Sequence, residues 1–177
     1  MICLFSIQTW AQSGKLFNTD NQLSSNLATQ VFQDKSGFIW IATRNGLNNY
    51  DGYHINVIKK DMSNFLGLNS NYINSIAQDE KEHILLGTNN SLLEFTGSEF
   101  LKIPMLDSKG KELATYVKQI YPLRNKDVAV ATSGYGIMLK KQDEQKCHAM
   151  KGEVEKLKYI HKLLEDKRGR LWIITED

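Results

Sequence analysis

Residues 30–52 read "QVFQDKSGFIWIATRNGLNNYDG", a pattern of short apolar runs enclosed by turn-forming residues. The run at 38–43 lies between Asp34-Lys35-Ser36-Gly37 and Asn45-Gly46, and the run at 47–50 ends at Asp51-Gly52. Asp accepts hydrogen bonds from the backbone of a turn and Gly supplies positive φ. Asn-Gly is typical of a two-residue type I′ hairpin, and we expect Asp51-Gly52 to act in the same way. The stretch therefore predicts antiparallel strands joined by tight turns.

The same pattern recurs at 75–92, 119–137 and 162–177. A threonine closes each apolar run, at Thr43, Thr88, Thr132 and Thr175, so that successive copies are 45, 44 and 43 residues apart. A lead-in also recurs, as "LSSNL" at 23–27 and "LNSNY" at 68–72. Four copies in register indicate a repeated structural unit rather than one active site.

The period and the internal pattern of each unit predict a β-propeller. In the first unit we expect strands near 28–33, 38–43, 47–50 and 54–58. Four antiparallel strands that recur every ~40–50 residues are typical of a propeller blade. The fourth copy ends after its second strand, with 159–165 as the first strand rather than a charged helix. The predicted fold is all-β, a partial β-propeller of about three and a half four-stranded antiparallel blades.

The second strand of each unit is apolar on both faces, as expected of a strand packed between two neighbouring blades. Trp40 and Trp172 occupy the same place in units one and four, and we align Leu85 and Val130 with them. These residues are predicted to form a packing layer and to have no catalytic or cofactor role.

The first unit resembles the repeat of two-component regulator propellers, the extracytoplasmic sensors of hybrid two-component systems common in gut Bacteroidetes. The positions that carry the resemblance are Leu23, Ser24, Asn26, Asp34, Gly37, Trp40, Ile41, Thr43, Gly46, Leu47, Tyr50, Asp51 and Gly52. The sequence departs from the family at Ala42, where Gly is usual. The later units keep fewer of these positions: Asp79, Gly87 and Thr88, then Thr132 and Gly136, then Asp166, Gly169, Trp172 and Thr175.

The repeats and the resemblance together suggest a domain plan. Residues 1–14 resemble the truncated remnant of a signal peptide, with an apolar first strand as the alternative. Residues 15–22 would supply a closing strand to the last blade of a complete ring and the lead-in to the first blade. Blades one to three are expected at 23–67, 68–111 and 112–155, and 156–177 would be the first half of blade four. On this plan residues 15–19 have no pairing partner here, and the chain is a piece of a longer protein.

The resemblance also implies a function. It makes the chain part of the periplasmic sensor region of an inner-membrane histidine kinase, whose complete propeller binds an oligosaccharide or another glycan ligand. Its other partners would be the remaining blades of a parent protein, which we expect to be dimeric. The kinase would lie in a domain that this chain lacks, so the chain itself is not expected to be an enzyme. A propeller lyase or hydrolase and a plain protein-interaction propeller remain as alternatives.

The composition and the reactive residues give no sign of other chemistry. Lys and Arg exceed Asp and Glu by only two, 22 against 20, which gives no electrostatic case for nucleic acid as a partner. Cys3 and Cys147 form no disulfide framework, and the four histidines have no metal-binding spacing. We therefore expect no catalytic residue, cofactor or metal site, and expect exposed positions for His54, His83, His148 and His161.

Four tyrosines lie outside the predicted packing layer: Tyr53, Tyr72, Tyr116 and Tyr135. Their rings could stack on sugars, or they could simply cover strand ends. The family motif builds the fold, so it assigns no ligand-binding residue.

Overall fold

A computed structural model describes residues 15–60 and 67–176, and the proposed signal-peptide remnant at 1–14 lies outside the described residues. The first unit consists of β1 (Ala28–Gln33), β2 (Ile39–Thr43), β3 (Gly46–Tyr50) and β4 (Ile55–Ile58). The second consists of β5 (Ile73–Gln78), β6 (Ile84–Thr88), β7 (Leu92–Phe95) and β8 (Phe100–Ile103). The third has β11 (Val117–Pro122), β12 (Val128–Thr132), β13 (Ile137–Lys140) and β14 (Cys147–Ala149), and the fourth has β15 (Ile160–Glu165) and β16 (Leu171–Thr175).

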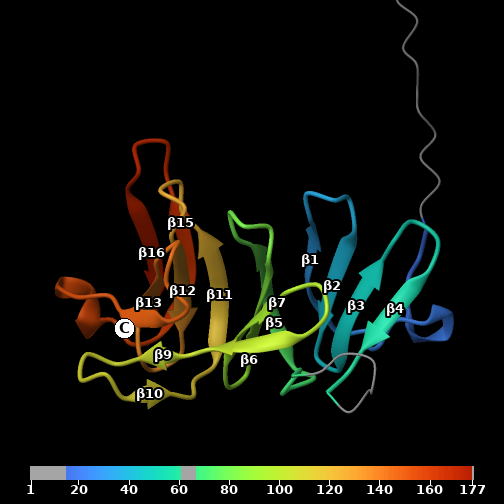
Figure 1. The fold of residues 1–177 in the computed structure, drawn as a ribbon, viewed down its shortest axis with the longest axis horizontal. Coiled ribbons are helices and arrows are strands. Elements are labelled where there is room, and N and C mark those ends of the chain that lie inside the picture. Colours follow the sequence, from blue (N-terminus) through green and yellow to red (C-terminus); the bar gives the residue numbers. More distant parts are fainter. Residues whose placement is uncertain (1–14, 61–66, 177) are drawn as a thin grey trace, which may run out of the picture.

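Each unit forms its own antiparallel sheet, in which successive strands are neighbours. The first strands contact one another in the order β1, β5, β11 and β15, so the sheets follow one another in space as they do in sequence (Figure 1). Two 3₁₀ helices, η1 (Thr19–Asn21) and η2 (Glu153–Lys156), complete the described secondary structure. Neither has the length or apolar character needed to cross a bilayer, within the residues described. The predicted all-β propeller architecture is confirmed.

The third sheet contains two strands that the repeat does not predict. The short strands β9 (Met105–Leu106) and β10 (Glu112–Leu113) extend it to six strands, and β9 pairs parallel to β14. Two-residue strands carry no alternation of side chains, so the sequence pattern did not reveal them. The sheet of the third unit therefore ends at the β9–β10 hairpin, which the sheets of the first and second units lack.

Three layers of buried apolar side chains join successive sheets. Trp40, Ile76 and Leu86 belong to a layer made by the first and second sheets. Leu85 belongs instead to the layer made by the second and third sheets. Alternate residues of β6 therefore face opposite neighbours, and all five of its residues are buried. This arrangement confirms the reason proposed for the continuous apolar runs.

The predicted alignment of Val130 with Trp40 is wrong by one residue. Trp40 pairs with Phe32 on the first strand, and the corresponding pair in the third unit is Ala129 with Tyr121. Ala129 faces the fourth unit, whereas Val130 faces the second. A shift of one residue reverses the face of a strand. Trp40 lies three residues before Thr43, and the residue three before Thr132 is Ala129, so the aligned threonines already indicate Ala129.

The recurring aspartate and threonine both stabilise turns through side-chain hydrogen bonds. The backbone N–H of Phe38 donates to Asp34 Oδ1 at 3.0 Å, and that of Arg170 donates to Asp166 Oδ1 at 3.0 Å. Thr43 Oγ1 donates to the Gly46 carbonyl at 2.8 Å across the next turn. Where glycine is missing from the first of these turns, Glu82 and Lys126 adopt positive φ values of 68° and 73°. These residues are structural, as predicted.

The two turns that follow β2 and β3 differ from the expected type I′ hairpins. Thr43 pairs with Gly46, so the central residues of the first turn are Arg44 and Asn45, and neither has positive φ. A type I′ turn requires positive φ at both. Gly46 is instead the first residue of β3, with φ of 134°, and an added Cβ would lie 3.0 Å from the Ile58 carbonyl oxygen. The next connection spans residues 51–54, where Asp51 accepts hydrogen bonds from the backbone of Tyr53 and His54.

The proposed closing strand at 15–22 is not a strand in this structure. Residues 19–21 form η1, and the preceding residues contact the first unit. Lys15 Nζ lies 3.2 Å from the Tyr50 hydroxyl, and the Phe17 and Tyr50 rings meet edge to face at 5.0 Å. Residues 15–19 pair with no strand among the described residues, as expected, although their side chains contact the first unit.

A side chain on each of the first three units bonds to the backbone of the next unit. Gln30 accepts from the Ile76 N–H at 2.9 Å and donates to the Ile76 carbonyl at 2.8 Å. Ser75 Oγ accepts from the Ile120 N–H at 3.0 Å. Gln119 makes the same pair of bonds to Leu163, at 2.7 and 3.3 Å. Each of these residues sits at a register shift in its first strand, which turns the side chain toward the neighbour.

We expect Gln30→Met to lower the free energy of unfolding by about 2 kcal/mol, because two hydrogen bonds between units are lost. Gln33→Met is the matched control, since Gln33 bonds only to Gly37 within its own exposed turn. Urea unfolding of the three proteins measures both effects. Equal losses in the two variants would show that the Gln30 bonds do not hold the units together.

Candidate functional site

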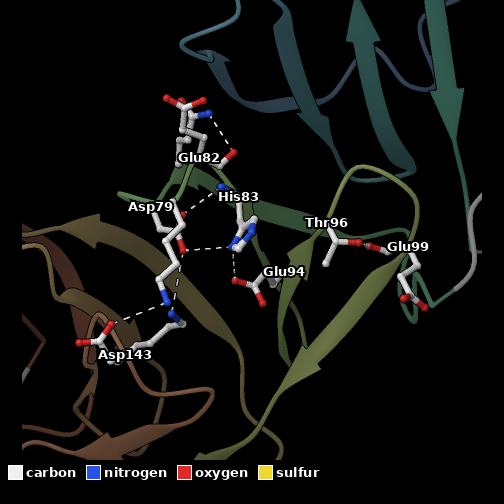
Figure 2. Close-up of polar contacts among 10 residues, drawn as sticks. Asp79, Glu82, His83, Glu94, Thr96, Glu99 and Asp143 are labelled. Atoms are coloured by element: carbon white, nitrogen blue, oxygen red, sulfur yellow. Dashed lines mark hydrogen bonds and ion pairs between the residues drawn. The ribbon is translucent and has the colours of Figure 1, made fainter.

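A cluster of four ionisable side chains lies between the second and third units. Asp79, Glu94 and Lys140 are buried, and the half-buried His83 lies at its edge. Figure 2 shows the His83 imidazole between the two carboxylates, with Nδ1 at 2.8 Å from Glu94 Oε1 and 3.6 Å from Asp79 Oδ2. Lys140 Nζ lies 4.0 Å from Asp79 Oδ2. The cluster thus combines residues of β7, of the β5–β6 turn and of β13.

The cluster occupies the place that a tryptophan side chain occupies in the first and fourth units. In those units the indole N–H donates to the aspartate of the turn, from Trp40 to Asp34 at 2.7 Å and from Trp172 to Asp166 at 3.0 Å. The Trp172 bond, with further donors from Arg170 and Arg168, lowers the pKa of Asp166 to about 2. Leu85 replaces the tryptophan in the second unit, and the Lys140 ammonium and the His83 imidazole face Asp79 in place of the indole.

The three possible ligand atoms of Asp79, His83 and Glu94 all lie within 4.8 Å of one another, close enough to share a metal ion. The buried Lys140 ammonium beside Asp79 opposes this use, because it would repel a cation. The Lys140 ammonium instead compensates the buried Asp79 carboxylate, which is how buried charges are ordinarily paired. The arrangement is better explained as an ionic connection between two blades.

The histidines were all expected at exposed positions, and that expectation is wrong for His83, which contacts two buried carboxylates. His54 and His148 are exposed, as predicted. His161 is partly buried and hydrogen-bonded to Glu176. No spacing in the sequence could reveal the His83 cluster, because its members come from four separate positions in two units.

The four candidate tyrosines are in three different settings. Tyr72 and Tyr116 meet edge to face at 6.1 Å, so the structure brings this pair together. Tyr53 is 84% exposed in the β3–β4 turn. Tyr135 borders a pocket of about 330 Å³ beside the added β9–β10 hairpin, with Asp107 and Lys158 also in its wall. The alternative that tyrosines cover strand ends fits Tyr72 and Tyr116, which directly precede β5 and β11.

Cys147 lies in the core between the second and third units. Burial raises the pKa of its thiol to about 12, so the reactive thiolate is suppressed at neutral pH. This cysteine therefore serves as a small apolar residue.

A second pocket, of about 320 Å³, opens where β1, β5, β11 and β15 converge. It is lined by polar residues of all four first strands, among them Asn74, Lys118 and Lys162. Because the four first strands come from different units, only the assembled row of blades creates this pocket.

Comparison with known proteins identifies the repeat. Residues 22–45, 67–90 and 156–177 match the two component regulator propeller family, and these ranges fall in units one, two and four. A search of curated proteins finds no match.

Several solved structures share the fold. An extracellular domain of a hybrid two-component system from B. thetaiotaomicron superposes with a TM-score of 0.73 at 17% identity, over 85% of this chain and 22% of that chain. A second such domain from the same organism superposes with a TM-score of 0.59 at 16% identity, over 91% of this chain and 29% of that chain. PorZ, a surface component of the type-IX secretion system of Porphyromonas gingivalis, superposes with a TM-score of 0.64 at 18% identity. The superposition covers 86% of this chain and 25% of that chain.

This chain spans less than a third of each of these structures, and the identities are low enough that the likeness concerns the fold. The family assignment comes from the repeats themselves, whose aspartates, threonines and tryptophans have the structural roles described above. Its repeats at 22–45, 67–90 and 156–177, which together make up less than half of the chain, match the two-component regulator propeller family.

Proposed function

We propose that the chain forms blades of the extracytoplasmic sensor region of a two-component signalling protein, and that this sensor recognises a glycan-derived ligand. The observation that carries the proposal is the agreement of the family repeats with the fold of solved extracellular domains of hybrid two-component systems. The chain has a binding role in this proposal, and catalysis belongs to a kinase domain elsewhere in the parent protein. The parent is proposed to be a dimeric inner-membrane protein with its propeller in the periplasm.

The residues of the described chain support a binding role over a lyase or hydrolase role. In the His83 cluster, Asp79 is paired with Lys140 and Glu94 is hydrogen-bonded to His83, so both carboxylates have a role in joining the two units. The two pockets, by contrast, are of a size that suits small ligands, at the low end of the range of ~300–1,000 Å³.

A protein-interaction role is the second candidate, and the likeness to PorZ favours it, because PorZ is described as a component of a secretion system. The two candidate functions predict different domains in the rest of the parent protein. A membrane helix followed by a histidine kinase would support the sensor, whereas their absence from the complete gene would favour the interaction role.

Calorimetric titration of the chain with a panel of neutral and acidic oligosaccharides tests ligand recognition directly. We expect heat of binding with one class of saccharide, and a melting temperature that rises with the concentration of that class. If every saccharide leaves a folded chain unaffected, the chain is not a glycan-binding part of a sensor.

A further inference from the structure

The pocket between the four first strands has an unusual balance of charge. Lys118 and Lys162 lie in its wall, and no carboxylate is among its described lining residues. His161 also lines it and is hydrogen-bonded to Glu176, a carboxylate outside the lining. The two ammonium groups therefore give the pocket a positive potential, although the whole chain is nearly neutral.

The remaining polar groups of the wall are mostly committed to other partners. Gln30, Ser75 and Gln119 make the bonds between units described above, and Thr29 Oγ1 donates to the Ile73 carbonyl at 2.6 Å. Their bonding capacity is used to hold the blades together. The two charged groups that can turn toward a ligand, Lys118 and Lys162, are donors only.

Asn74 adds a donor without a partner. Its Oδ1 accepts from the Tyr116 hydroxyl at 2.7 Å, while its buried Nδ2 has no hydrogen-bond partner among the described residues. Such an unmet donor is uncommon in folded proteins and calls for a nearby acceptor. The Lys118 ammonium lies 5.1 Å from the centre of the ring of Tyr116, the residue whose hydroxyl bonds to Asn74.

We propose that this pocket binds an oxyanion, the carboxylate or sulfate group of an acidic saccharide. An oxyanion offers several acceptor oxygens and a negative charge, which match two ammonium groups and an amide donor. The saccharide part of the proposal rests on the proposed sensor function, whereas the oxyanion part stands on the pocket alone. A neutral sugar would leave both lysines without an anionic partner.

Titration calorimetry of the whole chain at low salt, with galacturonic acid, sodium sulfate and galactose as probes, tests the proposal. We expect galacturonic acid to bind at least about 10-fold more tightly than galactose, the gain of one charge-assisted hydrogen bond. Lys118→Met and Lys162→Met should each weaken its binding by about 10-fold. Lys151→Met is the matched control, because Lys151 is exposed and outside the pocket lining.

The possible results separate this inference from the proposed function. Binding of both galacturonic acid and sulfate that weakens with added salt and with both pocket variants supports the site. Binding of sulfate alone with the same dependence supports the oxyanion pocket and overturns its assignment to a saccharide. Equal affinity for galactose and galacturonic acid, or affinities unchanged in both pocket variants, overturns the inference, while saccharide binding at another place would leave the sensor proposal intact. A melting curve of each variant establishes that it is folded.

Discussion

Replacing Trp40 with alanine is expected to lower the free energy of unfolding by about 3–5 kcal/mol. Trp40 is 6% exposed and contacts Phe95 of the second unit with ring centroids 5.8 Å apart. Its indole N–H also donates to Asp34. The substitution therefore opens a cavity between two blades and leaves the turn aspartate without one of its donors. Urea unfolding monitored by circular dichroism measures the loss.

The chain supplies its own control, because Trp172 holds the same position in the fourth unit but is 56% exposed. Trp172→Ala should cost about 1 kcal/mol or less, since it removes one exposed hydrogen bond and little packing. Trp40→Phe should lie between the two, since it keeps most of the packing and loses the bond to Asp34. Similar losses for Trp40→Ala and Trp172→Ala would contradict the buried layer between the first two sheets.

Replacing Lys140 with methionine is expected to destabilise the chain by about 3 kcal/mol, although it makes the buried side chain more apolar. The reason is that the Asp79 carboxylate stays buried when the Lys140 ammonium that compensates it is removed. Lys102→Met is the control, because Lys102 forms an ion pair with Glu112 in which both side chains are about half exposed. Exposed pairs of that kind contribute at most about 1 kcal/mol.

The double variant Asp79→Asn with Lys140→Met tests whether the two residues are coupled. If the cluster is an ionic connection, the double variant should be more stable than the sum of the two single losses predicts. If Lys140→Met is no more harmful than Lys102→Met, the Asp79 carboxylate does not depend on this ammonium. The metal interpretation would then need to be tested by zinc titration.

The sequence was enough to predict the blades because their signals are local. Asp34, Gly37 and Thr43 act within their own turns, and each apolar run lies within one strand. The errors arose where a single residue changes the geometry. Val130 lies one residue beyond the position that matches Trp40, which reverses the face of the strand, and the turn before Gly46 has Arg44 and Asn45 at its centre.

The candidate site was less predictable because it depends on contacts between units. His83 and Lys140 belong to different blades. The pocket between the four first strands is lined by Asn74, Lys118 and Lys162, which come from three of those strands. None of these residues has a motif spacing, and the repeat alignment treats their positions as variable. The pocket between the first strands combines positions that vary between units, such as Asn74 and Lys118, with Gln30 and Gln119, which hold the units together.

Amide hydrogen exchange across the whole chain tests most directly the claim that the repeat builds a row of blades. We predict three regions of slow exchange, at β2, β6 and β12, because each of these strands is paired on both sides and buried between neighbours. We also predict faster exchange in β16, whose residues are all at least partly exposed. A protection profile without maxima near residues 39–43, 84–88 and 128–132, or with its slowest exchange at the charged stretch 151–158, would contradict the blade arrangement.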